Sequence, residues 1–175
     1  MSQATASPMA ARVHGGADAR GAARWDFSTC ANAAGPCPMA LAAVQAADAT
    51  RYPDPAATAV RQALAALHGV EPERILPAAS ASEFIQRITA VTGRLWPGAV
   101  KVPRWVYGDY AEAAAAWGRA SQAAMPDETH DDGASPAPPY TLRWYADPTS
   151  PMGQDGDPPE GDARSFPAVL DAVYA

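Results

Sequence analysis

The fold is decided by residues 74–102, which read RILPAASASEFIQRITAVTGRLWPGAVKV. The short apolar run at 74–77 predicts a strand. The following segment, 82–91, places apolar side chains on one helical face at Phe84, Ile85, Ile88 and Val91. The triplet Val100-Lys101-Val102, with β-branched residues at both ends, then predicts a second strand. A strand, a helix and a strand in succession are typical of α/β proteins with a mainly parallel sheet and flanking helices.

The same alternation continues toward the C-terminus. We expect a helix at 107–117 and strands at 121–125, 141–145 and 169–170. The segments 126–139 and 154–162 are crowded with Asp, Gly, Ser and Pro, so they are expected to be surface loops. The predicted fold is therefore an α/β domain whose sheet is incomplete in this chain.

Two helices are expected before this region. The alanine-rich segment 38–49 predicts a short helix. Residues 55–68 predict a better-marked helix that Asp54 caps and Gly69 ends. Its expected core stripe is Val60, Leu64 and Leu67. The sequence thus divides into a disordered leader at 1–12, an arm with a first helix at 13–54, and a partial α/β domain at 55–175.

Composition limits the function. The hydrophobic content of 48% with 18% charged residues is typical of a globular protein, and a net charge of -6 argues against a nucleic-acid partner. No apolar run approaches the length of a membrane helix or of a signal segment. We expect a cytoplasmic protein. Lys101 is the single lysine, which matters because several kinds of covalent catalysis need an amine.

The two cysteines, Cys30 and Cys37, are too far apart for the close pairs of a zinc site, and a metal site with His14 or His68 is disfavoured. A disulfide between them stays open on spacing alone. We favour two small, reduced, buried side chains.

The segment Ser80-Ala81-Ser82-Glu83 fits the capping-box pattern at the start of the expected helix. Small residues there would let an anion such as a phosphate approach the free amides. A purely structural cap is the alternative, and it is the commoner use of this pattern.

A carboxylate follows the last expected strand at Asp171, with a phenol three residues later at Tyr174. A buried aspartate can hold a protonated ring nitrogen. A helix cap or an ordinary loop residue is the alternative for Asp171. The turn-rich segment 147–154 follows another strand, where α/β proteins bind ligands.

The order of these pieces resembles class I/II, fold-type I pyridoxal-phosphate enzymes, especially histidinol-phosphate aminotransferase and the threonine-phosphate decarboxylase of cobalamin biosynthesis. The similarity extends from His14 to the end of the chain. It rests on the ordered matches His14-Gly15-Gly16, Asp26-Phe27-Ser28-Thr29, Asn32 with Gly35-Pro36, Arg51-Tyr52-Pro53-Asp54-Pro55, His68-Gly69-Val70 and Pro72-Glu73-Arg74-Ile75.

The resemblance implies roles for several residues around pyridoxal 5'-phosphate. Ala81 and Ser82 would bind the phosphate through their amides and the Ser82 hydroxyl, and Tyr107 would stack on the pyridine ring, although core packing is the alternative for Tyr107. Asp171 would pair with the ring nitrogen, and Tyr174 would donate to the ring's phenolic oxygen.

Two further roles involve the partner subunit and a departure from the pattern. Tyr52 resembles the tyrosine that reaches the neighbouring subunit's phosphate, which implies a homodimer with shared sites. Ser150 stands in the place of an asparagine that contacts the ring oxygen, so its contact is expected to be weaker.

The lysine that forms the Schiff base in this family lies downstream of the aspartate and tyrosine, beyond Ala175. Lys101 does not match it by order, and we expect it to be a strand lysine that reaches solvent. The catalytic residue is therefore absent from this sequence, which predicts a truncated chain that is inactive alone.

Three functions remain open. The first is an aminotransferase that moves an amino group between an amino acid, phosphorylated or not, and a keto acid. The second is decarboxylation of a phosphorylated amino acid by the same cofactor. The third is a non-catalytic α/β fragment that binds a phosphate or a partner.

Overall fold

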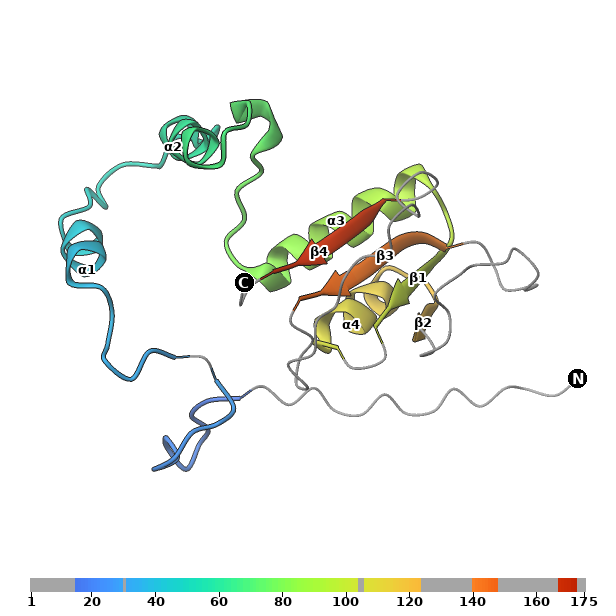
Figure 1. The fold of residues 1–175 in the computed structure, drawn as a ribbon, viewed down its shortest axis with the longest axis horizontal. Coiled ribbons are helices and arrows are strands. Elements are labelled where there is room, and N and C mark those ends of the chain that lie inside the picture. The colour runs from blue at the N-terminus through green and yellow to red at the C-terminus, as the bar shows by residue number, and fades with distance from the viewer. Residues whose placement is uncertain (1–14, 30, 104–105, 124–139, 148–166, 173–175) are drawn as a thin grey trace, which may run out of the picture. The chain divides into compact units, whose positions relative to one another are not determined.

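The computed structural model describes residues 15–29, 31–103, 106–123, 140–147 and 167–172 (Figure 1). The chain divides into two compact units, residues 1–63 and 64–175. The leader at 1–12 and the loops at 126–139 and 154–162, all expected from the sequence, lie outside the described residues. Within the described part, no helix is long and apolar enough to cross a bilayer.

The second unit is built on a four-stranded sheet in the order β2-β1-β3-β4, and each neighbouring pair of strands is parallel. The strands are β1 (Ala99–Val102), β2 (Ser121–Ala123), β3 (Tyr140–Ala146) and β4 (Ala168–Asp171). The predicted α/β fold with a mainly parallel sheet is confirmed. Four of the five expected strands, at 100–102, 121–125, 141–145 and 169–170, correspond to β1, β2, β3 and β4 to within a few residues.

Two helices, α3 (Ala81–Leu95) and α4 (Asp109–Ala116), pack against each other and against the same side of the sheet (Figure 1). Successive side chains of a strand point to opposite faces of the sheet, so Val100 and Val102 of β1 and Leu142 and Trp144 of β3 point toward the helices. The core between the two layers consists of Ile85, Val100, Val102, Tyr110, Ala113, Ala114, Leu142 and Trp144. This is the hydrophobic core of the second unit.

The strand expected at 74–77 is wrong. Residues Pro72–Arg74 form a short 3-10 helix, η1, and the chain that follows is extended but pairs with no described strand. Pro77 has no N–H to give to a sheet, and Leu76 is exposed. The apolar character of this segment therefore does not indicate a strand.

Helix α2 (Thr58–His68) begins three residues later than expected. The Asp54 carboxylate accepts the amide N–H groups of Ala56 and Thr58, each at 2.9 Å, so Asp54 does cap this turn. Ala57, however, has a φ of 48°, a left-handed conformation that interrupts a helix. The helix can only start after it.

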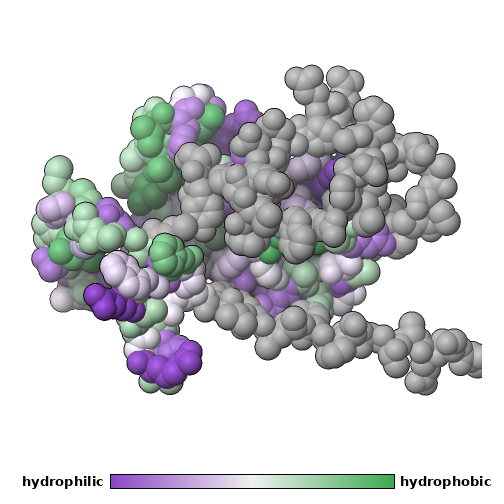
Figure 2. Space-filling model, turned by 60° about the horizontal axis from the view of Figure 1, so that its bottom comes forward, coloured by the Kyte–Doolittle hydropathy of each residue, from purple (hydrophilic) through white to green (hydrophobic). Residues whose placement is uncertain are grey.

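The apolar side chains of α1 (Pro38–Gln45) and α2 lie largely at the surface (Figure 2). The expected core stripe of α2 is wrong at two of its three positions, because Val60 is 52% exposed and Leu67 is 75% exposed, whereas Leu64 is half-buried. Helical periodicity shows which face is apolar, but it does not show whether that face is covered.

Two predictions about single side chains are also wrong. Cys37 is exposed at the start of α1, whereas we expected it to be buried; Cys30 lies outside the described residues. Lys101 is only 3% exposed, and its Nζ lies 4.7 Å from the centre of the Tyr140 ring. Lys101 belongs to a strand with neighbours on both sides, and all four residues of that strand are buried.

Candidate functional site

The candidate site lies at the edge of the sheet where the strands end. The described strands are parallel, so Val102, Ala146 and Asp171 all end at this edge. Helix α3 joins β1 through residues 96–98 alone, and it must therefore run back so that its N-terminus lies at the same edge (Figure 1). Ligands of open α/β sheets bind outside this edge.

The N-terminus of α3 is held by a network that the sequence predicted in part. The Ser80 hydroxyl accepts the Glu83 amide N–H at 3.1 Å, which confirms the predicted cap. Glu83 accepts the Ala79 amide at 3.3 Å and binds Arg87 at 2.6 Å. Arg87 also donates to the Pro77 carbonyl oxygen at 3.1 Å. The turn that precedes the helix is thus tied to its first two turns.

This cap leaves the first amides of α3 directed outward. An α-helix makes no internal bond with its first amides, and here Ser80 serves only those of Glu83 and Phe84. The amides of Ala81 and Ser82 therefore face the strand-end edge. The Ser82 hydroxyl lies 3.3 Å from the Tyr107 hydroxyl, which connects α3 to the segment after β1.

A cavity of about 530 Å3 lies between the start of α3 and the end of β4. Ser80 and Ala81 line it from the helix, and Asp171 lines it from the strand. Its apolar walls include Phe84 and Trp144. The indole N–H of Trp144 is buried and has no hydrogen-bond partner within the described residues, which is costly for a donor.

Asp171 is held from the helix side by Tyr110. The Tyr110 hydroxyl donates a hydrogen bond to Asp171 Oδ2. The Tyr110 ring stacks on Trp144 with centroids 4.5 Å apart and an angle of 5° between the planes, and the Tyr107 ring meets its edge at 6.2 Å. Ser82, Tyr107, Tyr110 and Asp171 therefore form one connected set from the helix tip to the strand end.

Sequence reasoning missed Tyr110 and Trp144. Tyr110 follows Tyr107 by three residues; it lies in the first turn of α4, and Tyr107 lies two residues before that helix. Trp144 occupies a position of β3 that alternates toward the helices. These two spacings were the available signals, but nothing in them identifies Asp171 as the acceptor.

Burial and the bond to Asp171 raise the pKa of the Tyr110 phenol above its ordinary value. In the unfolded chain this phenol ionises near pH 10. Its contribution to stability is therefore complete below about pH 10 and is lost as the pH rises beyond that value. We expect the free energy of unfolding to fall above about pH 10, and to fall less in Tyr110→Phe. Urea unfolding across this range measures it, and an equal fall in both proteins would contradict the assignment.

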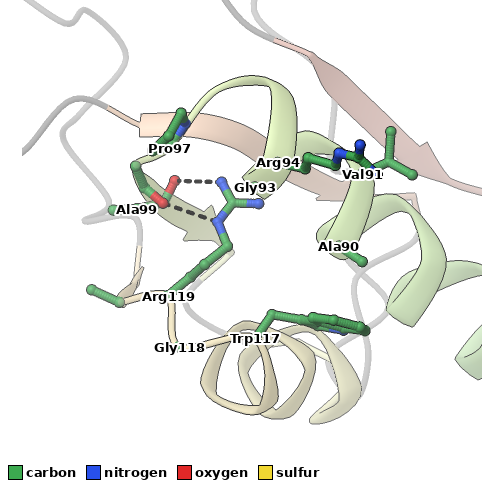
Figure 3. A pocket seen from close by; sticks show the side chains of 11 residues that line it. Ala90, Val91, Gly93, Arg94, Pro97, Ala99, Trp117, Gly118 and Arg119 are labelled. Atoms are coloured by element: carbon green, nitrogen blue, oxygen red, sulfur yellow. Dashed lines mark hydrogen bonds between the residues drawn. The ribbon is translucent and has the colours of Figure 1, made fainter.

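A second cavity, of about 790 Å3, lies at the opposite edge of the sheet, where β1 begins (Figure 3). Gly98 and Ala99 line it together with the C-terminal turns of α3 and Trp117. It is larger, but the guanidinium of Arg119 at its rim is bonded to Gly98 and Ala99. The strand-end cavity combines open amides with a carboxylate, and it is the better candidate.

The predicted site residues divide into three groups. Ala81 and Asp171 line one cavity, and Ser82 contacts Tyr107. Tyr52 belongs to the first unit and is fully exposed there. Ser150 and Tyr174 lie outside the described residues.

Comparison of the sequence with protein-family models and with curated proteins gives no match. Solved structures do match. The putative histidinol-phosphate aminotransferase from Erwinia carotovora atroseptica SCRI1043 has a TM-score of 0.61 at 22% identity, over 78% of this chain and 43% of its own. L-threonine-O-3-phosphate decarboxylase from Porphyromonas gingivalis has a TM-score of 0.59 at 21% identity, over 71% of this chain and 38% of its own.

A third similar structure is histidinol-phosphate aminotransferase from Sinorhizobium meliloti in complex with pyridoxal-5'-phosphate. Its TM-score is 0.55 at 26% identity, over 69% of this chain and 34% of its own. The chain spans less than half the length of each of these proteins. Their fold is that of fold-type I pyridoxal-phosphate enzymes, so the resemblance predicted from the sequence is confirmed as a likeness of fold.

Proposed function

We propose that this chain is part of a pyridoxal-phosphate-dependent aminotransferase, which moves an amino group between an amino acid and a keto acid. The observation that carries the proposal is the cavity that joins the start of α3 to the end of β4. One end offers amides to an anion and the other end offers a carboxylate to a cationic ring nitrogen. Pyridoxal phosphate has both groups at opposite ends of one ring.

The residues present fit this cofactor. Ala81 and Ser82 would hold its phosphate through their amides, where the helix dipole favours negative charge. Asp171 would accept the N–H of the ring nitrogen and keep that nitrogen protonated. Tyr107 would cover the ring face and exclude water. When bound, the cofactor supplies an electron sink for reactions at the amino-acid α-carbon.

Lys101 does not fit the amine that such an enzyme requires. It lies on β1 between Val100 and Val102, which both point toward the helices, so its side chain points to the opposite side of the sheet. Asp171 pairs with Ala146 on the helix side. The proposal therefore gives Lys101 no part in the chemistry, and it predicts cofactor binding without turnover in this chain alone.

Several finer parts of the proposal come from the family resemblance. Ser150 and Tyr174 would contact the ring oxygen, and Tyr52 would reach the phosphate of the partner subunit in a cytoplasmic homodimer.

Two alternative functions use part of the same site. The match to L-threonine-O-3-phosphate decarboxylase supports decarboxylation of a phosphorylated amino acid with the same cofactor site. A non-catalytic fragment that binds phosphate through α3 would explain the helix tip but not Asp171 in the same cavity.

The substitution Ala81→Asp tests the phosphate end of the site. An aspartate in the first turn suits the helix dipole, so the helix should persist. Its negative charge would repel the phosphate, and we expect the dissociation constant for pyridoxal phosphate to rise about tenfold or more, equivalent to about 1.4 kcal/mol. Equilibrium titration of tyrosine and tryptophan fluorescence with pyridoxal phosphate measures it.

The matched control is Ala59→Asp, which places the same charge in the first turn of α2. It should leave the affinity unchanged. Pyridoxal without its phosphate should bind Ala81→Asp and the natural chain alike, since the charge acts on the phosphate. Equal affinity of all three proteins for pyridoxal phosphate, or borohydride fixation of the cofactor on Lys101, would overturn the proposed site.

A further inference from the structure

We propose that Tyr110 is a positioning residue that holds the Asp171 carboxylate in the orientation in which it meets a ring nitrogen, an inference that rests on the proposed function. The Tyr110 hydroxyl and Asp171 Oδ2 are joined by a hydrogen bond across sixty-one residues of sequence. This bond connects the first turn of α4 to the end of β4.

The contact suits a positioning role because Tyr110 itself has little freedom. Its side chain is fully buried, its ring stacks on Trp144, and the edge of its ring meets Tyr107. Asp171 is the last residue of β4. Its backbone pairs with Ala146 and its carbonyl oxygen accepts the Asp147 amide N–H at 2.9 Å, so what the phenol orients is the side chain. The phenol therefore provides the fixed point, and the carboxylate is the group that is fixed.

The direction of the hydrogen bond also fits. The pKa of Tyr110 is raised, mainly by burial, so the phenol stays neutral and donates. A carboxylate that accepts this proton remains the acceptor for another donor, because its two oxygens offer about four lone-pair sites. Tyr110 would thus orient Asp171 and still leave it able to accept the N–H of the ring nitrogen.

The test is a double-mutant cycle on the affinity of the whole chain for pyridoxal phosphate. Tyr110→Phe removes only the hydroxyl and keeps the stack on Trp144. We expect it to raise the dissociation constant about tenfold, within the range for a hydrogen bond to a charged group. In an Asp171→Asn background the same substitution should have no further effect, because the group on which it acts is gone.

A second readout needs no cofactor. The 13C resonance of the Asp171 carboxyl group should shift in Tyr110→Phe. It should not shift in Tyr145→Phe, which removes the same hydroxyl group from a residue of β3. Tyr145 follows Trp144, so its side chain points to the side of the sheet away from the helices. Tyr145 contacts Arg143 there. This readout follows the contact itself, whether or not the chain binds the cofactor.

The outcomes separate the two proposals. Absence of binding by the natural chain would overturn the proposed function and the inference that rests on it. Binding that Tyr110→Phe leaves unchanged would overturn only the inference. An equal loss in the natural and Asp171→Asn backgrounds would also overturn it, since Tyr110 would then act through the general packing. Inorganic phosphate should compete equally well in Tyr110→Phe and in the natural chain.

Discussion

Trp144→Ala is expected to lower the free energy of unfolding by about 3–5 kcal/mol, the range for deletion of a large aromatic side chain from a core. Trp144 is 2% exposed, and it lies between the helix layer and the strand-end cavity. Its removal would take away the surface on which Tyr110 stacks and would enlarge a cavity that is already present. Urea unfolding followed by circular dichroism measures the loss.

The matched control is Trp117→Ala. Trp117 follows α4, is 55% exposed, and its indole N–H donates to Gln86 at 2.9 Å. Removal of this partly exposed ring should cost about 1 kcal/mol or less. Equal losses in the two variants would show that the Trp144–Tyr110 stack is not the centre of the core.

The fold could be predicted from the sequence where periodicity and burial agree. The spacing of the apolar residues at 82–91 fits a helix, and the pattern at 100–102 fits a strand. Both segments form the expected type of element, α3 and β1. The prediction failed at 74–77, because an apolar run cannot reveal whether a neighbouring strand is there to pair with it. It failed at Val60 and Leu67 for a related reason, since an apolar face does not specify what covers it.

The candidate site was predictable only in its separate parts. The cap at Ser80 is a local pattern, and the structure confirms it directly. Asp171 lies ninety residues from Ala81, and its place in the same cavity follows from strand order, which no local pattern encodes. Family resemblance supplied the pairing of these two residues. It did not supply Tyr110, because a residue that supports a site from behind carries no signal of its own in the sequence.

At the edge of the sheet where β1 and β3 begin, the side chain of Arg119 makes hydrogen bonds to three elements. The guanidinium of Arg119 donates to the carbonyl oxygens of Gly98 and Thr89, each at 2.9 Å. It also donates to the hydroxyls of Thr92 at 2.8 Å and Thr141 at 2.6 Å. One side chain therefore joins the end of α3 to the starts of β1 and β3, and its pKa is lowered by partial burial.

Arg119→Ala is expected to lower the free energy of unfolding by about 3 kcal/mol, because it leaves acceptors from three elements without their donor. Arg94→Ala is the matched control: Arg94 lines the same cavity but is exposed, so its loss should cost less than about 0.5 kcal/mol. Urea unfolding of both variants measures the difference. Equal stability of the two variants would contradict the role of Arg119 as the side chain that joins α3, β1 and β3. Because Arg119 lies at the edge opposite Asp171, its loss should lower stability while the affinity of the folded chain for pyridoxal phosphate stays unchanged. The stability that Arg119 contributes and the ligand binding at Asp171 would then depend on opposite ends of the same strands.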